Sequence, residues 1–254
     1  MSVVIACYKW VIDEADLRIN ADLSVDSSKA KGKISDYDKN AIEASVQIAA
    51  ELGGKPIGLT FGDSMSKNSL KDALSRGLEE AVWIQSEEAA SADGRVTAQV
   101  MAAAIKKLEN VSLIICAEGA SDTYARQTAP RLGALLNLPV VTSVCNMQLQ
   151  GQTLKLQRKL DDCLETVEVA LPAIISVLPE VNEPTIPGLK AVMAAGKKPV
   201  TQWTGKDLGV DLQPRVQAAP LQGYVMNRKN IILQGEPAEQ VQQMVAALRK
   251  EGVL

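Results

Sequence analysis

Hydrophobic and polar positions divide most of this chain into two kinds of segment that follow one another in turn. Short apolar runs, typical of buried strands, lie at Val3–Cys7, Pro56–Phe61, Ala81–Ile84, Leu113–Cys116, Val140–Cys145 and Ala173–Leu178. The longer segments between them carry apolar residues at helical spacing, which predicts helices at 36–52, 67–76, 93–108 and 128–136. Strands that alternate with helices predict an α/β protein with a Rossmann-like parallel sheet flanked by helices.

Two later segments break this pattern. Met147–Arg158 and Cys163–Ala170 alternate with period two on either side of a turn, which predicts an antiparallel hairpin appended to the sheet. From residue 200 the periodicity is lost until an amphipathic helix at Pro237–Glu251. We therefore predict an α/β domain over residues 1–199 and an extended C-terminal arm over residues 200–254. Such an arm needs a surface to lie on, which indicates a permanent partner chain.

Composition places the chain among ordinary soluble globular proteins. Of its 254 residues, 46% are hydrophobic and 22% are charged, and the net charge is −3. Because no strongly basic run occurs, we expect no nucleic-acid partner. No apolar stretch approaches the roughly 18 residues of a membrane helix, so we expect no membrane insertion. The N-terminus enters a strand pattern directly, without the features of a signal peptide, and the predicted location is the cytoplasm.

The missing histidine narrows the possible chemistry. A chain without histidine excludes Ser-His-Asp and Cys-His catalysis and imidazole metal sites. The four cysteines, Cys7, Cys116, Cys145 and Cys163, show no Cys-x-x-Cys spacing, which argues against a zinc site or a disulfide framework. We therefore predict neither catalytic residues nor metal ligands.

The stretch Ser112–Gly133 is the strongest candidate for a binding site. Its apolar run reads as a strand, and Pro130 marks the first turn of the helix that follows, with the N-cap near Thr128. Free N–H groups and the positive end of the helix dipole make such a place an anion site, to which Arg126 and the Thr128 hydroxyl would add. One interpretation is a phosphate-binding loop at the carboxyl end of a parallel strand. The alternative is an ordinary strand–loop–helix connection with a capping threonine.

Six segments together resemble a known family. They are Tyr8–Asp13, Ser35–Glu43, Gly119–Pro130, Leu164–Thr166, Asn182–Pro184 and Asp207–Asp211. In their order and spacing they resemble the beta subunit of electron transfer flavoprotein, and they span nearly the whole chain. The Tyr-Asp-x-Asn-Ala-Ile-Glu and Ser-Asp-x-Tyr-Ala-x-Gln versions of two of these segments are most similar to the FixA-like bacterial branch.

The resemblance implies a heterodimer with an alpha subunit that holds most of the redox FAD. The beta subunit of the family binds AMP in simple carriers and a second FAD in electron-bifurcating ones, and its C-terminal arm packs on the partner. Electrons would pass from a flavin dehydrogenase or reduced nicotinamide to a quinone-linked acceptor. The chain itself would be a carrier subunit without bond-making chemistry of its own, since electron transfer needs cofactor placement rather than proton-shuttling side chains.

The resemblance also implies a nucleotide site. Carried over residue by residue, the site comprises Ala6, Tyr8, Lys9, Ser35, Thr60, Phe61, Gly62 and Gly119–Thr128, including Ser121. Within it we assign Asp122 to the sugar or to shaping of the loop, and Arg126, Gln127 and Thr128 to the phosphates. These positions follow three predicted strands and begin the first helix, and the carboxyl ends of parallel strands form the usual ligand crevice.

Some positions depart from the family or carry further roles in it. Ser35 stands where the family typically has asparagine, and Arg126 where it often has asparagine or alanine. Near Glu14 the family often has a tyrosine positioned toward the redox flavin. Leu189 matches the leucine of the family's docking loop, although a core anchor is the alternative. Glu165 matches a glutamate that helps to orient the mobile flavin domain, although a solvent-facing strand glutamate is the alternative.

Two other classes of function stay open on the sequence. One is a stand-alone adenine-nucleotide-binding module that senses or hydrolyses ATP, which the architecture alone would allow. Against it stand the missing Gly-x-x-x-x-Gly-Lys-Ser/Thr loop and the lack of a clear acidic pair for a metal. The other is a purely structural partner chain whose crevice binds nothing.

Overall fold

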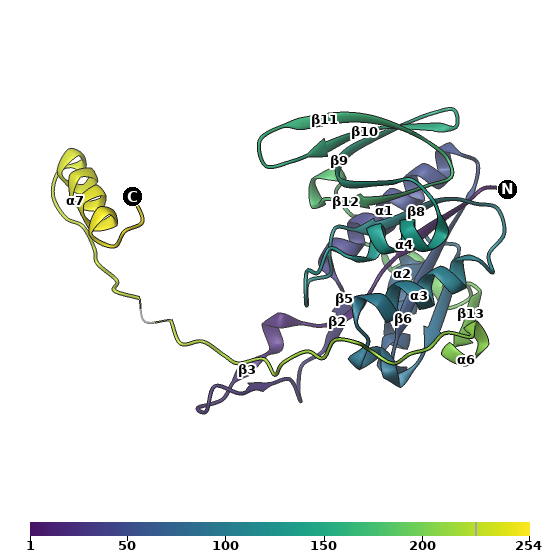
Figure 1. Ribbon diagram of the computed structural model, residues 1–254, viewed down its shortest axis with the longest axis horizontal. Helices are drawn as coiled ribbons and strands as arrows, with labels where there is room; N and C mark the ends of the chain where they lie inside the picture. The colour runs from purple at the N-terminus through teal and green to yellow at the C-terminus, as the bar shows by residue number, and fades with distance from the viewer. Residues whose placement is uncertain (227) are drawn as a thin grey trace. The chain divides into compact units, whose positions relative to one another are not determined.

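The computed structural model describes residues 1–226 and 228–254 (Figure 1). These residues form two compact units. The larger unit consists of Met1–Arg18 and Asp26–Pro220, and the smaller consists of Ile19–Val25 and Leu221–Leu254. Each unit is described by itself below.

A nine-stranded sheet forms the centre of the larger unit, in the order β11-β10-β9-β12-β8-β1-β6-β7-β13. Its strands are β1 Val3–Cys7, β6 Lys55–Gly62, β7 Glu80–Gln85, β8 Val111–Ala117, β9 Val140–Gln150, β10 Thr153–Lys159, β11 Leu164–Ala170, β12 Ala173–Val177 and β13 Val200–Thr204. Neighbours from β9 to β13 pair in parallel, whereas β10 is antiparallel to both β9 and β11. The predicted fold class is confirmed.

Helices cover both faces of the sheet (Figure 1). Those of the larger unit are α1 Asp36–Glu51, α2 Asn68–Ser75, α3 Gly94–Ile105, α4 Thr128–Leu136, α5 Leu189–Ala195 and α6 Gly205–Leu208, with single 3-10 turns η1 Glu14–Asp16, η2 Ser64–Lys67, η3 Glu87–Ser91 and η4 Pro179–Val181. Successive side chains of a strand point to opposite faces. On β1, Ile5 and Cys7 pack with α3 and α4, whereas Val4 and Ala6 pack with α1 and α2.

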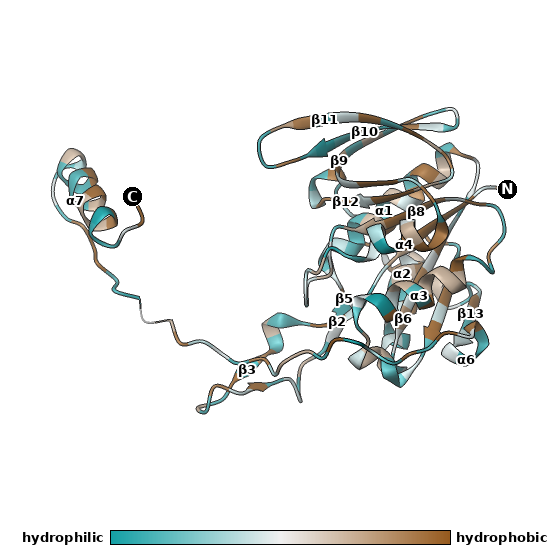
Figure 2. Ribbon diagram, in the orientation of Figure 1, coloured by the Kyte–Doolittle hydropathy of each residue, from teal (hydrophilic) through white to brown (hydrophobic). Residues whose placement is uncertain are grey.

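Hydrophobic residues are concentrated in the central strands (Figure 2). Burial on two faces explains why β1, β8 and β12 are nearly continuous runs of Val, Ile, Leu, Ala and Cys, because neither face meets solvent. Aliphatic side chains thus build most of the core, and Phe61 is the one phenylalanine in the sequence. This arrangement leaves the carboxyl ends of β1, β6 and β8 at one edge of the sheet.

The antiparallel extension differs from the predicted hairpin. Met147–Arg158 was expected to be one arm, but β9 continues to Gln150 and β10 starts at Thr153. Gly151 makes the turn between them with a positive φ of 64°, a conformation that glycine adopts without strain. The extension consequently has three antiparallel strands rather than two. The predicted turn between β10 and β11 lies where expected.

The sheet also continues past the predicted domain boundary at residue 199. Val200–Thr204 forms β13, which pairs in parallel with β7 at the sheet edge. Its residues alternate between exposed and half-buried, so they lack the apolar run of a central strand. That the later residues pack on a partner chain stays a prediction.

Smaller elements complete the two units. β2 Trp10–Ile12 pairs antiparallel with β5 Gly32–Ile34. This pairing joins the two ends of the long segment between β1 and α1. Within that segment, β3 Arg18–Ile19 and β4 Val25–Asp26 form a second two-stranded sheet. The smaller unit contains the amphipathic helix α7, Pro237–Lys250, close to the predicted bounds.

Candidate functional site

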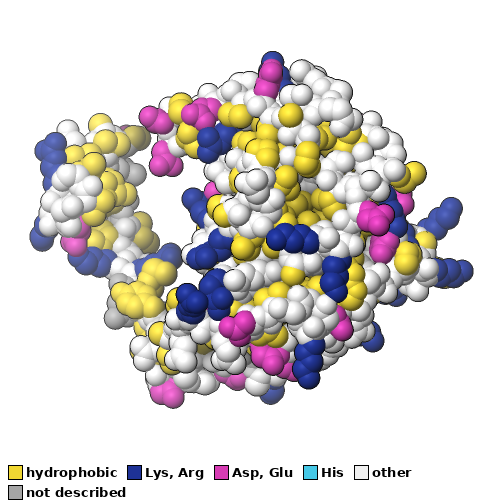
Figure 3. Space-filling model, turned by 45° about the vertical axis from the view of Figure 1, so that its right-hand side comes forward, with side chains coloured by type: hydrophobic (Ala, Val, Ile, Leu, Met, Phe, Trp, Pro, Cys, Tyr) yellow, Lys and Arg dark blue, Asp and Glu magenta, His cyan; other side chains and the backbone are white. Residues whose placement is uncertain are grey.

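A cleft of about 1190 Å³ opens at the carboxyl ends of three neighbouring strands. Cys7 of β1, Phe61 of β6 and Cys116 of β8 line it. In open α/β sheets this edge is where ligands bind, because the loops and helix N-termini that follow the strands meet there. Figure 3 shows one face of the molecule, on which Lys and Arg side chains border hydrophobic ones.

Most of the residues predicted for the nucleotide site come together in this cleft. Those that line it are Tyr8, Lys9, Phe61, Gly119, Asp122, Arg126, Gln127 and Thr128. Ala6 and Thr60 do not line it, because they are fully buried within β1 and β6. Gly62 ends β6 and faces Ser66 instead.

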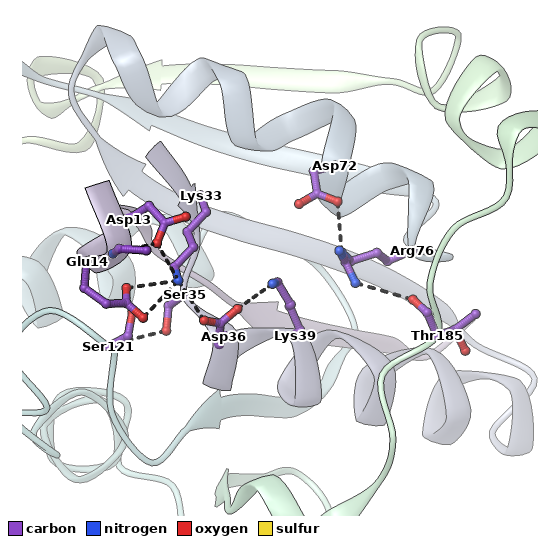
Figure 4. A network of polar contacts seen from close by, with 11 residues as sticks. Asp13, Glu14, Lys33, Ser35, Asp36, Lys39, Asp72, Arg76, Ser121 and Thr185 are labelled. Atoms are coloured by element: carbon purple, nitrogen blue, oxygen red, sulfur yellow. Dashed lines mark hydrogen bonds and ion pairs between the residues drawn. The ribbon is translucent and has the colours of Figure 1, made fainter. Parts of the chain in front are cut away.

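Ser35 and Ser121 do not line the cleft but are hydrogen-bonded to each other. The buried Ser35 hydroxyl accepts a hydrogen bond from the Ser121 backbone N–H at 3.2 Å (Figure 4). Ser35 thus ties the start of α1 to the loop after β8, rather than capping α1 with its side chain. The Ser121 hydroxyl is itself buried and has no partner among the described residues.

A network of charged side chains holds the segment that precedes α1 in place (Figure 4). The Lys33 ammonium lies 2.9 Å from both Glu14 and Asp36 and 3.1 Å from Asp13. These hydrogen bonds raise the pKa of Lys33 above its ordinary value. Because Asp36 starts α1, the network holds the first turn of α1 against the small β2–β5 sheet. Glu14 takes part in this network through its pairing with Lys33.

The loop between β8 and α4 is held in an unusual conformation. Tyr124 and Arg126 have positive φ angles of 46° and 56°, which are uncommon for residues with side chains. The largely buried Glu118 carboxylate accepts a hydrogen bond from the Tyr124 hydroxyl at 2.5 Å and pairs with the Arg126 guanidinium at 3.3 Å. That guanidinium also lies 4.9 Å from the centre of the Tyr124 ring. Sequence reasoning missed Glu118, although it decides how the loop is shaped.

Gly119 makes this loop possible. A Cβ atom at Gly119 would lie 2.9 Å from Tyr124 Cδ2 and 3.1 Å from Tyr124 Cα. The loop folds back on itself so closely that only glycine fits without a shift of backbone. Arg126 is therefore both a wall of the cleft and a partner of Glu118, so its charge is shared with that carboxylate.

The N-terminus of α4 is open toward the cleft. Gln127 occupies the cap position but makes no capping hydrogen bond with its side chain, and Thr128 is the first residue of the helix rather than its cap. The predicted N-cap near Thr128 thus lies one residue earlier, at Gln127, and the choice between a phosphate-binding loop and an ordinary connection stays a prediction. The N–H groups of Thr128 and Ala129 stay available, since the first N–H groups of a helix have no partner within it. The Arg131 guanidinium donates to the Gln127 side chain at 3.1 Å and lines the same cleft.

The N-terminus of α3 meets the cleft from another side. One oxygen of Asp93 caps α3 by accepting from the Val96 N–H at 2.9 Å. Its second oxygen accepts from the N–H groups of Arg215 at 2.8 Å and Val216 at 3.3 Å. The Arg95 guanidinium donates to the Gln213 carbonyl at 2.6 Å. Residues 213–218, here called the strap, are thereby held as one wall of the cleft.

Asp38 is a buried carboxyl in the wall of the cleft. It lies in the first turn of α1, is 5% exposed and accepts from the Lys9 N–H at 2.7 Å through Oδ2. The Lys9 ammonium in turn pairs with Asp122 at 2.5 Å. Burial raises the pKa of the Asp38 carboxyl to about 8, although the Lys9 N–H and ammonium act in the opposite direction. A carboxyl in this environment holds its proton to higher pH than an exposed one.

Basic side chains outnumber acidic ones around the cleft. Its basic residues are Lys9, Arg95, Arg126, Arg131 and Arg215, and its acidic residues are Asp38, Asp93, Glu118 and Asp122. Among the described residues, no carboxylate lies within ion-pair distance of Arg95, Arg131 or Arg215. Three unpaired guanidinium groups and an open helix N-terminus together favour an anionic ligand.

The two positions predicted to meet partner molecules lie away from the cleft lining. Leu189 begins α5 and is 77% exposed, so it is not a core anchor in this chain. Glu165 lies on β11 and pairs with Arg158 at 2.7 Å. Within residues 1–226 and 228–254, no three His, Cys, Asp or Glu side chains are grouped so that they could hold a metal ion. None of the helices in that same part of the chain is long and apolar enough to cross a membrane.

Comparison with protein families decides the relationship. The electron transfer flavoprotein domain model matches residues 22–208, which is more than half of the chain and includes the cleft loop, α4 and most of the sheet. The chain belongs to the electron transfer flavoprotein domain family. Membership indicates a role of the electron transfer flavoprotein type, in association with flavin and in complexes with redox partners. The family resemblance is confirmed at this level.

Proposed function

We propose that this electron transfer flavoprotein domain is the beta subunit of a heterodimeric carrier of the FixA-like branch. It passes electrons from a flavin dehydrogenase or reduced nicotinamide to a quinone-linked acceptor, through FAD held mainly by an alpha subunit. The proposal is supported by the family match over residues 22–208 and by the six segments of the beta subunit pattern. The observation that carries it is the basic cleft at the carboxyl ends of β1, β6 and β8.

In this proposal the cleft holds AMP or a second FAD. The open N–H groups of Thr128 and Ala129, together with Arg131 and Arg126, would bind the phosphates. The buried, unpartnered hydroxyl of Ser121 offers another polar contact close to the loop. A volume of about 1190 Å³ exceeds the roughly 300–1000 Å³ of typical small-molecule sites, so it does not restrict the ligand to a mononucleotide.

The chain supplies placement rather than bond-making chemistry. FAD supplies the redox chemistry when it is bound. The residues of this chain bind the nucleotide, orient it and exclude water from it. The proposed docking surface is the apolar group Ile186, Leu189 and Met193, which are 89%, 77% and 69% exposed. Glu165 is proposed to contact the mobile flavin domain of the alpha subunit, in exchange for its pairing with Arg158.

The nucleotide content of the purified complex tests this proposal. The chain is co-expressed with its candidate alpha subunit, the complex is denatured, and FAD and AMP are quantified by chromatography. One FAD and one AMP per heterodimer support a simple carrier, and two FAD support a bifurcating protein. A chain that purifies alone and colourless with ATP bound would favour a stand-alone nucleotide module instead. No nucleotide beyond the FAD of the alpha subunit would mean that the cleft is structural.

A further inference from the structure

Two cysteines lie side by side where neighbouring strands reach the cleft. β1 and β8 run in parallel, and their register places Ala6 beside Ile115. The next residue of each strand is a cysteine, so Cys7 and Cys116 lie opposite each other. Both are free thiols, belong to the same hydrophobic cluster on one face of the sheet, and line the cleft. The proposed function assigns no role to this pair.

The spacing of the two strands suits a disulfide bond. Neighbouring strands lie about 4.7–4.9 Å apart, and the Cα atoms of a disulfide are separated by roughly 4.4–6.8 Å. The Cβ atoms of a disulfide come closer, to roughly 3.5–4.5 Å, so the bond would draw the ends of β1 and β8 together. A disulfide that forms against such resistance is readily reduced, which is typical of regulatory rather than structural disulfides.

We propose that Cys7 and Cys116 form a reversible disulfide when the cleft is empty, and that this bond weakens nucleotide binding. Formation of the bond is independent of the proposed function, whereas its effect on the nucleotide rests on that function. Each cysteine leads into a wall of the cleft, to Lys9 after β1 and to Asp122 after β8. The ion pair of Lys9 with Asp122, at 2.5 Å, joins these walls. Movement of the strand ends would displace them, and a binding site must hold its geometry to within about 0.5 Å.

Hydrogen peroxide is the proposed oxidant, and reduced flavins release it when they react with O₂. One thiolate attacks a peroxide oxygen, which gives a sulfenic acid and hydroxide, and the hydroxide becomes water with the proton of the thiol. The second thiol attacks the sulfenic sulfur and expels another water as the S–S bond forms. Two thiols and one peroxide thus give one disulfide and two waters, and two electrons pass from sulfur to oxygen.

The surroundings of the pair make this reaction slow and dependent on access. The pKa of the Cys7 thiol is raised by the neighbouring Cys116 thiol, by burial and by the charge of Asp38. Because the thiolate is the reactive form, the pair resists oxidation at ordinary peroxide levels. A nucleotide in the cleft would cover both sulfur atoms, since both line it. Occupancy of the cleft should therefore protect the pair.

Peroxide treatment of the full-length chain tests the inference. Cys145→Ser and Cys163→Ser together remove the two thiols that do not line the cleft, and this double variant is the background. The chain, with any partner subunit that co-purifies, is freed of nucleotide, treated with hydrogen peroxide with or without AMP, unfolded and alkylated with iodoacetamide. Its intact mass should fall by two hydrogen atoms with no alkyl group added, and AMP should slow this change. Calorimetry should show AMP binding about tenfold weaker after oxidation and restored by dithiothreitol.

The outcomes distinguish this inference from the proposed function. Cys116→Ser in the same background is the matched control, in which peroxide should cause neither the loss of two hydrogen atoms nor weaker AMP binding. Two alkylated thiols after peroxide treatment, or a disulfide that leaves AMP affinity unchanged, overturns the inference and leaves the nucleotide site intact. If the background variant does not fold, peptide mapping of the oxidised wild type decides whether the bond forms. If the reduced chain binds neither AMP nor FAD, the proposed nucleotide site fails, whatever the mass shows.

Discussion

At the scale of single residues, Arg126 has a double role. Its guanidinium lines the cleft and also neutralises Glu118, which is largely buried. Removing Arg126 would therefore subtract a cation from the site and add an unpaired carboxylate close to the proposed phosphates. Both changes act against an anionic ligand.

We expect Arg126→Ala to bind AMP or FAD roughly tenfold more weakly than the wild type. Chromatographic quantification of the nucleotide retained after purification measures this. Glu118→Gln in the Arg126→Ala background should recover part of the loss, since it removes the unpaired charge. Unchanged nucleotide content in Arg126→Ala would remove Arg126 from the site.

The raised pKa of Asp38 also predicts how stability depends on pH. In the folded chain the carboxyl holds its proton up to about pH 8, whereas in the unfolded chain it loses it near the ordinary value of 3.8. The folded state thus binds more protons between these values, and stability from this group decreases as the pH rises through that window. The loss amounts to about 1.4 kcal/mol for each pH unit and ends above the folded pKa.

Urea unfolding at pH 5 and pH 8 measures this effect. The free energy of unfolding of the wild type should fall relative to that of Asp38→Asn by up to about 4 kcal/mol over these three pH units. Equal pH dependence in the two proteins would show that Asp38 is ionised in the folded state.

Sequence reasoning predicted some of the residues that line the cleft and missed others, for identifiable reasons. Lys9, Gln127 and Thr128 follow strands or begin a helix, so their place in the crevice follows from the α/β pattern. Asp38 is acidic and lies in a first helical turn, where acids are favoured on exposed surfaces as well. Its buried carboxylate accepts a hydrogen bond from the N–H of Lys9, 29 positions earlier in the chain, and no local pattern shows such a contact.

At the scale of elements, the central strands were predictable because burial on both faces requires continuous apolar runs. β13 escaped prediction because its edge position leaves alternate residues exposed. The turn at Gly151 was overlooked because the alternation of β9 continues across it into β10. The strap has no periodicity at all, and its position depends on Asp93 and Arg95 of another element.

Asp93 joins two elements, which leads to a prediction for each. Asp93→Ala removes the cap of α3 and the anchor of the strap, so we expect the melting temperature to fall by roughly 2–4 °C and bound nucleotide to dissociate faster. Asp93→Ser is the matched control, because serine caps helices but lacks the second carboxylate oxygen. It should restore the melting temperature but not the slow dissociation. Equal dissociation rates in wild type and Asp93→Ser would show that the strap does not retain the ligand.

At the scale of the whole molecule, the segment that carries Leu189 is anchored to α1. Asn40 donates to the carbonyls of Pro179 and Asn182 at 3.0 and 2.9 Å, and Asn182 donates back to the Asn40 carbonyl at 3.1 Å. Glu43 accepts from the Thr185 N–H at 3.1 Å. Two of the six segments that carry the family resemblance are therefore in contact, and the exposed apolar residues beyond them project from a fixed base.

Leu189→Ala should lower the rate of electron transfer to a partner about tenfold, because a few residues carry most of the binding energy of an interface and Leu189 is exposed in the proposed docking surface. Flavin content and melting temperature should not change, since Leu189 is 77% exposed. Stopped-flow reduction of the partner measures the rate. Leu135→Ala, an exposed leucine on α4, serves as a control of the same chemistry. Loss of flavin in Leu189→Ala would place Leu189 in a structural role instead.

The strap has a consequence for the order of events during biosynthesis. Domains begin to fold while the ribosome is still adding residues, at about 5–20 residues per second. Every other wall of the cleft, up to Arg131, is translated before the strap. A cofactor that arrives in the seconds before residues 213–218 emerge meets a crevice that lacks this wall, whereas one that arrives later meets the wall already held by the hydrogen bonds to Asp93 and Arg95. The contacts available to a cofactor would then become complete only at the end of translation, when the strap joins the walls that are already folded.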